Sequence, residues 1–200
     1  MAAAWQPLLD WWFGPSRQAA EVAAQQHGLW FGKQAGQDAE ARERFGVFVE
    51  QALNGDLEEW SDAAEGWLAL LLLLDQLPRM IHRDAARAFA GDARAQRVVQ
   101  AGLAEGREAA LPAIGRAFVY LVLEHAEDLA RQDEAVRRFR QLHGQAAPAE
   151  QALFAGFLDY AERHRAVIAR FGRFPQRNAA LGRRSSAAER AFLGEPGSRF

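Results

Sequence analysis

Three clusters of polar residues in this sequence have the residue types and spacing that chemistry at a binding site requires. The first is Leu74-Asp-Gln-Leu-Pro-Arg79, in which Asp75 follows an apolar stretch and Arg79, four residues later, or Arg83 can pair with it. Because an unpaired carboxylate is costly in an apolar setting, we expect Asp75 to form an ion pair. That pair either fixes the chain at Pro78 or holds an arginine whose guanidinium group faces a ligand.

The second cluster, Glu124-His-Ala-Glu-Asp128, places a histidine on the apolar face of a predicted helix. Asp128 lies on the same side of that helix as His125, where a carboxylate can fix the tautomer of an imidazole and raise its basicity. The sequence therefore predicts a His125–Asp128 dyad, and a hydrogen-bonded core histidine is the plainer interpretation. Glu127 precedes Arg131 by four residues and is predicted to pair with it on the helix surface.

The third cluster begins at His164-Arg165, and His164 also lies on an apolar face. Two inward histidines on different helices could meet across a bundle, and with Asp75 or Asp128 they would form a site with two histidines and one carboxylate for a metal ion. The sequence contains no local metal-ligand motif such as His-Glu-x-x-His, so we assign no metal and no cofactor.

Arginines make up most of the remaining third cluster, since seven arginines and no acidic residue lie between residues 163 and 188. Gly172 and Pro175 place some of them on a turn whose backbone can approach a ligand, so a site for phosphate or carboxylate is one interpretation. The alternative is that these arginines pair with the acidic residues between Asp38 and Glu65 and hold the C-terminal part on the rest of the chain.

The elements that must position these clusters are predicted to be helices, because apolar residues recur at helical spacing and strand-like alternation is nearly absent. Residues 63–77 are apolar nearly all round, as in a helix enclosed by neighbours, and Pro78 is expected to break or kink it. We predict an all-α fold of seven to nine antiparallel helices in a single domain, 1–200.

Several residues are placed to begin or end these helices. Gly55 and Gly172 can end helices in a left-handed conformation, and Ser186-Ala-Ala-Glu189 has the pattern of a capping box. Aspartates are predicted to cap three further helices, at Asp38, Asp92 and Asp133. The helix that carries His125 is predicted to run on to Leu129.

Aromatic residues gather before residue 32: Trp5, Trp11, Trp12, Trp30 and Phe31. We expect them to anchor the core, whereas exposed they would form a groove for a peptide.

Composition excludes several classes of protein. The chain has 200 residues, of which 50% are hydrophobic and 25% charged, with a net charge of −2, so disorder and general binding of nucleic acid are not expected. The longest apolar run, 67–74, is far shorter than the ~18–20 residues that cross a bilayer. The absence of cysteine excludes disulfides and thiol catalysis, and with no secretory leader at the N-terminus it suits a cytoplasmic protein.

Several phrases, collinear over almost the whole chain, together resemble the bacterial family called domain of unknown function 924. They are Asp10-Trp-Trp-Phe-Gly14, Trp30-Phe-Gly32, Leu74-Asp-Gln-Leu-Pro-Arg79, Ala86-Arg-Ala-Phe89, Tyr120 with His125-Ala-Glu-Asp128, His164-Arg165, Arg170-Phe-Gly-Arg-Phe-Pro-Gln-Arg-Asn178 and Leu181-Gly-Arg183. The resemblance implies an all-helical, tetratricopeptide-like stack of helix pairs and brings no established activity. Two departures from the family's pattern matter, since Val122 replaces a usual proline and Ala126 replaces a usual serine whose hydroxyl would lie beside His125.

The residues on which the family's recurrent positions fall are largely those of the three clusters. The candidate ligand-binding residues are Asp75, Gln76, Arg79, Arg83, His125, Glu127, Asp128, His164, Arg165, Arg173, Arg177, Asn178 and Arg183. We expect a module that binds a peptide, a protein or a small anion through a pocket lined by histidine, aspartate and arginine. The alternative is a small hydrolase or phosphate-handling enzyme in which a His125–Asp128 dyad works beside arginines. In a third interpretation all the clusters are internal structural networks.

Overall fold

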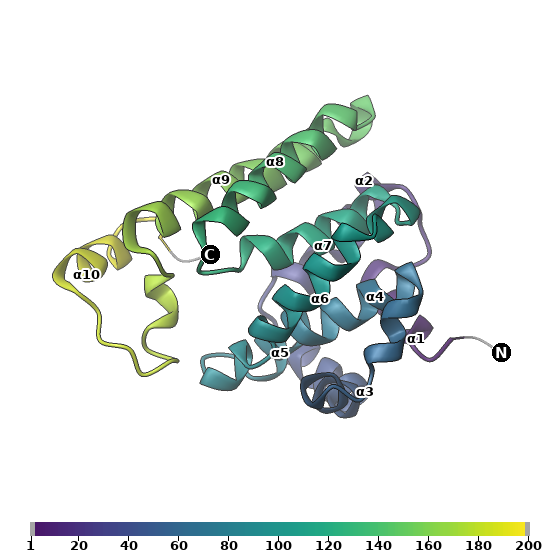
Figure 1. Ribbon diagram of the computed structural model, residues 1–200, viewed down its shortest axis with the longest axis horizontal. Coiled ribbons are helices and arrows are strands. Elements are labelled where there is room, and N and C mark those ends of the chain that lie inside the picture. The colour runs from purple at the N-terminus through teal and green to yellow at the C-terminus, as the bar shows by residue number, and fades with distance from the viewer. Residues whose placement is uncertain (1–2, 199–200) are drawn as a thin grey trace.

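A computed structural model describes residues 3–198, and this part of the chain is helical with no strand (Figure 1). The helices are α1 Gln6–Phe13, α2 Ala19–Phe31, α3 Ala35–Asn54, α4 Ala64–Leu71, α5 Leu77–Ile81, α6 Asp92–Ala104, α7 Ala113–Glu124, α8 Leu129–Gln145, α9 Gln151–Phe171 and α10 Ala187–Leu193. A π-helical turn, Leu72–Gln76, joins α4 to α5 without a break, so residues 3–198 hold nine separate helices. The predicted all-α class is confirmed.

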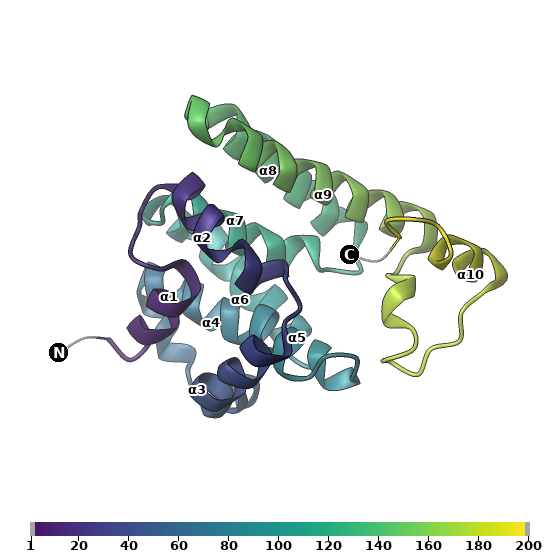
Figure 2. The ribbon, with the colours of Figure 1, turned by 180° about the vertical axis from the view of Figure 1, so that it is seen from behind.

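Helices α1–α7 form one body, and α8 and α9 form a long antiparallel hairpin that lies against α7 (Figures 1 and 2). After α9 the chain turns back beside the body and ends with α10. The tetratricopeptide-like stacking implied by the family resemblance stays a prediction. Among residues 3–198 we find no helix with the length and apolar character needed to span a bilayer.

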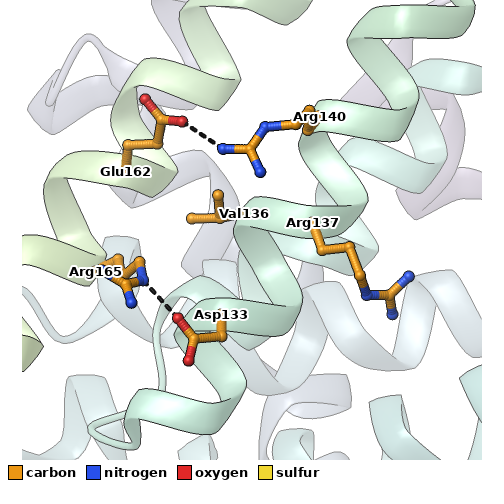
Figure 3. A pocket seen from close by; sticks show the side chains of 6 residues that line it. All are labelled: Asp133, Val136, Arg137, Arg140, Glu162 and Arg165. Carbon is orange, nitrogen blue, oxygen red and sulfur yellow. Dashed lines mark hydrogen bonds and ion pairs between the residues drawn. The ribbon is translucent and has the colours of Figure 1, made fainter.

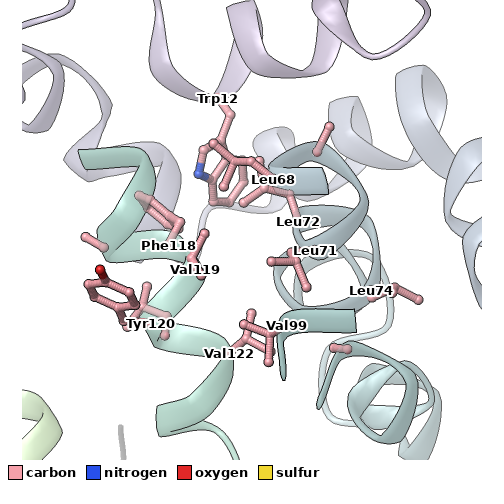
Figure 4. Close-up of a cluster of buried hydrophobic side chains, with 14 of the residues drawn as sticks. Trp12, Leu68, Leu71, Leu72, Leu74, Val99, Phe118, Val119, Tyr120 and Val122 are labelled. Atoms are coloured by element: carbon pink, nitrogen blue, oxygen red, sulfur yellow. The ribbon is translucent and has the colours of Figure 1, made fainter. Parts of the chain in front are cut away.

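The core is built around α4 and α7, whose side chains face each other in Figure 4. Trp12 is fully buried, and its ring lies edge-on to Phe118 with centroids 5.5 Å apart. The Trp30 indole Nε1 donates to the Trp12 carbonyl at 2.9 Å. Trp12 and Trp30 therefore anchor the core as predicted, whereas Phe31 is 47% exposed.

The predicted helix ends are confirmed where they depend on local geometry alone. Gly55 and Gly172 end α3 and α9 with positive φ angles of 95° and 68°. At the start of α10, Ser186 accepts from the Glu189 amide and Glu189 accepts from the Ser186 amide, which completes the predicted capping box.

The three predicted aspartate caps are wrong. Asp38 and Asp92 lie inside the first turns of α3 and α6, and the carboxylates of both pair with arginines. Asp133 lies in the interior of α8, because Asp128 is the residue that caps this helix, accepting from the Arg131 amide at 2.9 Å. The helix of His125 consequently ends at Glu124 and does not reach Leu129.

Pro78 does not break its helix, so of the two outcomes expected at this residue, a break or a kink, the break is wrong. Proline cannot donate to the carbonyl four residues before it, and the wider π turn accommodates this missing bond. The freed carbonyl of Leu74 is covered by Gly91, where a Cβ atom would come within 2.1 Å of the oxygen. This close approach brings the start of α6 against the π turn.

Candidate functional site

The site is a group of buried and partly buried charged residues that we call the polar junction: Asp75, Arg79, Asp92, His125 and Arg177. These residues come from the π turn, α5, the start of α6, the end of α7 and the turn Pro175–Arg177. Sequence reasoning selected four of them, and the fold adds Asp92.

Asp75 is the centre of the junction and is 1% exposed. Its carboxylate lies 2.8 Å from His125 Nδ1 and 3.1 Å from Arg79 Nη1, and it accepts from Gln76 Nε2 at 2.6 Å. Arg79 Nη1 also donates to the Asp75 backbone carbonyl at 2.6 Å. Burial alone would raise the pKa of Asp75, but Arg79 and His125 outweigh it and lower that pKa to about 2. The predicted ion pair of Asp75 with Arg79 is therefore confirmed.

His125 follows the last residue of α7, and its side chain is 16% exposed. Burial lowers the pKa of His125, and the charges of Arg79 and Arg177 lower it further against the opposing effect of Asp75. The neutral ring donates from Nδ1 to Asp75, which leaves Nε2 as the acceptor nitrogen of the ring.

The predicted His125–Asp128 dyad is wrong. Asp128 is exposed and its carboxylate is occupied in capping α8. The carboxylate that fixes the His125 tautomer is that of Asp75, fifty residues earlier.

Two arginines of the junction share one carboxylate. Arg79 Nη2 lies 2.9 Å from Asp92 Oδ1, and Arg177 Nη1 donates to Asp92 Oδ2 at 3.1 Å. The Arg177 guanidinium also lies against the rings of Phe89 and Phe174, 5.0 Å and 4.4 Å from their centroids. Burial and the neighbouring charge of Arg79 lower the pKa of Arg177 to about 10, so the two cations repel each other more than Asp92 compensates.

A second group of contacts, which we call the C-terminal clasp, holds the segment that carries Arg177. Glu127 accepts from both Nη atoms of Arg183 at 2.6 and 2.8 Å and from the Phe174 amide at 2.8 Å. Arg183 also donates to the Phe174 carbonyl and to Asn178. These contacts lower the pKa of Glu127 although its partial burial would raise it. The predicted surface pair of Glu127 with Arg131 is wrong.

Arg173 closes the same segment onto α10. It donates to both carboxylate oxygens of Glu189, at 2.7 and 2.9 Å, and these bonds lower the pKa of Glu189 to about 2. We considered above that the C-terminal arginines pair with the acidic residues between residues 38 and 65. Arg173, Arg177 and Arg183 pair instead with Glu189, Asp92 and Glu127. Acidic residues between 38 and 65 pair with nearer arginines: Asp38 with Arg83, Glu50 with Arg87 and Glu58 with Arg94.

His164 does meet His125 across the bundle, with ring centroids 6.2 Å apart. His164 is 5% exposed, and its Nδ1 lies 2.9 Å from both Glu124 Oε1 and the Tyr160 carbonyl. The other carboxylate oxygen of Glu124 is buried without a partner. Within residues 3–198 no three histidine or carboxylate side chains are grouped so that they could hold a metal ion, so the two histidines and Asp75 do not form the metal site considered above.

Two candidates lie apart from the junction. Arg83 pairs with Asp38 on the surface, and Arg165 pairs with Asp133 across α8 and α9. Arg165 lines an open groove of about 450 Å³ between these helices, shown in Figure 3, together with Asp133, Val136, Arg137, Arg140 and Glu162.

Sequence reasoning missed three contributors to this region. Asp92 and Phe89 frame the arginine pair, and Glu124 contacts His164. The sequence carries only partial signs of these contacts. Asp92 comes directly after Gly91, a short distance beyond the first cluster, and Glu124 directly precedes His125. The contacts themselves depend on the close approach of Gly91 to the π turn, which local spacing does not reveal.

Comparisons with known proteins found a family model and a solved structure that match most of this chain. The model of the family described as bacterial protein of unknown function (DUF924) matches residues 8–197. A solved structure of a protein of unknown function from Agrobacterium tumefaciens is 34% identical and superimposes with a TM-score of 0.72, covering 88% of this chain and 99% of its own. No curated protein matches this chain.

Proposed function

The chain belongs to the DUF924 family of bacterial proteins of unknown function, and from this premise we propose that its polar junction binds a small anion. The observation that carries the proposal is the pair Arg79 and Arg177, two cations that both contact the carboxylate of Asp92, while Arg79 also pairs with Asp75. An oxyanion beside them would reduce their repulsion and would accept further hydrogen bonds from the two guanidinium groups.

A small anion suits the junction better than a peptide. The side chains of Arg79, Asp92 and His125 are 18%, 23% and 16% exposed, and that of Arg177 is 9% exposed. These small openings offer an approach to a compact group such as phosphate or carboxylate, whereas an extended peptide needs a groove. The groove of Figure 3 lies between α8 and α9 and includes none of the junction residues.

Thermal unfolding with inorganic phosphate, acetate and short peptides tests the proposal. A ligand at about 100 times its Kd should add ~2.7 kcal/mol of stability and raise the Tm by a few degrees. We expect phosphate or acetate to do so, and Arg177→Met to remove the effect. Arg165→Met is the control, because Arg165 lies in the α8–α9 groove. An equal Tm increase in Arg177→Met would contradict the proposal.

Catalysis is the second candidate, and the Asp75–His125 contact favours it. A neutral imidazole whose Nδ1 donates to a carboxylate carries its lone pair on Nε2 and can act there as a general base. In this version Asp75, rather than Asp128, orients the imidazole of His125. The arginines stabilise the negative charge on the reacting group of the substrate. Turnover of p-nitrophenyl acetate or p-nitrophenyl phosphate that is lost in both His125→Ala and Asp75→Asn would support it, and equal rates in wild type and His125→Ala would exclude it for these substrates.

The proposal also places the protein in the cytoplasm, since a chain with no cysteine suits a reducing compartment. It requires no metal or cofactor, and it treats residues 1–200 as one domain.

A further inference from the structure

A third group of arginines lines a separate cavity of about 310 Å³. The cavity is bordered by α6 and by the short turns Glu58–Asp62 and Arg107–Ala110, and Trp67 of α4 lies at its back. Its polar lining includes Arg94, Arg97 and Arg107. None of these residues belongs to the polar junction or to the C-terminal clasp.

Arg107 has a donor that no protein group uses. Its Nε and Nη2 atoms bind Glu105 at 2.7 and 2.6 Å, while its Nη1 is buried and has no hydrogen-bond partner. A buried donor left without an acceptor costs free energy, so a structure that retains one calls for an explanation. A ligand oxygen in the cavity would satisfy it once the guanidinium group turns this buried atom toward the cavity.

The other two guanidinium groups leave a positive excess at the cavity. Arg97 donates to the Ala93 carbonyl of its own helix at 3.2 Å. Arg94 pairs with Glu58 at 2.7 Å, and that glutamate side chain is 74% exposed. Glu58 pairs with Arg94 and Glu105 with Arg107, so the three arginines that line the cavity exceed their carboxylate partners by one charge.

One wall of the cavity is apolar. Val98, Ala101 and Gly102 of α6 form it, with the fully buried ring of Trp67 behind Gly102. A Cβ atom at Gly102 would come within 2.3 Å of that ring, so only glycine lets the indole lie this close to the helix. The indole Nε1 donates to the Val98 carbonyl at 3.0 Å, which leaves the ring no free polar atom.

We propose that this cavity binds a small organic oxyanion, a phosphate or carboxylate group carried on an apolar body. Arg107 and Arg97 bind the oxyanion, because planar guanidinium groups match its geometry. The apolar body lies against Val98, Ala101 and Gly102. The volume is that of a small-molecule site rather than of a macromolecular interface.

The test is a titration of the full-length protein, followed by the NMR signal of the Trp67 indole N–H. The probes are phenyl phosphate, benzoate and inorganic phosphate, which separate the two oxyanions from the apolar body. We expect phenyl phosphate or benzoate to shift the Trp67 signal and to bind several-fold more tightly than inorganic phosphate. Arg107→Met, which keeps the aliphatic stem, should weaken this binding at least tenfold, and Arg97→Met should weaken it less.

Two control variants separate this site from others. Arg177→Met removes a cation from the polar junction, and Arg140→Met removes one from the α8–α9 groove, so both should bind the probes at the cavity as the wild type does. Circular dichroism checks that each variant is folded, and Arg107→Lys replaces Arg107→Met if the latter unfolds. The proposal is overturned if no probe shifts the Trp67 signal, if inorganic phosphate binds as tightly as the aromatic anions, or if the Arg107 variant binds like the wild type. Loss of the Trp67 shift in Arg177→Met would also overturn it, whereas the proposal for the junction would stand.

Discussion

The polar junction and the α8–α9 groove use the same residue types in opposite settings. In the groove, Arg140 pairs with Glu162 and Arg165 with Asp133 between side chains that are 42–64% exposed (Figure 3). In the junction, Asp75 is 1% exposed and pairs with an arginine and a histidine. Surface pairs contribute ~0–1 kcal/mol, while breaking a buried pair leaves an uncompensated charge and costs several times more. The burial of the ion pairs, rather than their number, therefore distinguishes the candidate site from pairs that only link two helices at the surface.

The largest expected difference is between Asp75→Ala and Asp133→Ala. Removing Asp75 leaves Arg79 and His125 without their shared partner, so we expect a loss of about 3–5 kcal/mol in the free energy of unfolding. Removing Asp133 from its exposed pair should cost less than ~1 kcal/mol. Urea unfolding of both variants measures the two values. Similar losses in the two variants would show that burial does not separate the regions.

Acid should weaken the junction. The pKa of Asp75 falls from 3.8 to about 2 on folding, so its stabilising effect is complete above pH ~4 and is lost as the pH falls toward 2. The lowered pKa of His125 acts in the same direction, because the unfolded chain takes up a proton below pH ~6.5 more readily than the folded one.

The shift of Asp75 corresponds to about 2 kcal/mol in the free energy of unfolding, since one pKa unit is ~1.4 kcal/mol. Urea unfolding between pH 7 and pH 2 measures the loss for the wild type and for Asp75→Asn. The variant should lack the part of the loss that belongs to Asp75. An NMR titration that places the pKa of His125 above 6.5 would contradict the contribution assigned to the histidine.

The C-terminal clasp should have an intermediate effect. Arg183→Met removes the paired bonds to Glu127, whose side chain is 26% exposed, so we expect a loss of about 1–2 kcal/mol. It should also weaken phosphate binding at the junction, because the clasp holds the turn that carries Arg177. Calorimetric titration of Arg183→Met with phosphate measures this effect. Unchanged affinity would mean that Arg177 is positioned without the clasp.

The smallest effect is expected in the groove. Arg165→Met and Arg140→Met should each change the free energy of unfolding by less than ~0.5 kcal/mol, and less still at high salt. Thermal unfolding at low and high ionic strength measures both. A large, salt-independent loss of stability in either variant would show that the ion pairs of the groove contribute as much as buried ones.

Local spacing predicted those features whose partners lie within one turn of a helix. The end of α9 at Gly172, the capping box of Ser186 and the pair of Asp75 with Arg79 follow from patterns of three or four residues. Neighbouring residues in the sequence supply both partners of each of these features.

Spacing could not predict partners that the fold brings from far along the chain. His125 meets Asp75, and Glu127 meets Arg183, across separations of 50 and 56 residues. The spacing of three residues predicts that Asp128 contacts His125. The free backbone amides at the start of α8 compete for the same carboxylate, and the Arg131 amide binds it. The contact with His125 and the cap of α8 both lie within a few residues of Asp128, so only the three-dimensional arrangement decides which of them forms.

The π turn Leu72–Gln76 sets the phase of one continuous helix. An α-helix advances ~100° per residue, and a π turn holds one residue more than the α-helical turn it replaces, so it rotates everything after it by about that angle. Deleting one residue from Leu72–Leu74 would restore uniform winding and keep the apolar composition. Because the deletion removes the extra residue that the π turn accommodates, Pro78 and Arg79 would keep their direction toward Gly91 and Asp92 relative to α4. Two relatives of equal hydrophobicity that differ by one residue here would therefore share both the core and the polar junction, one with a π turn and the other with a uniform α-helix.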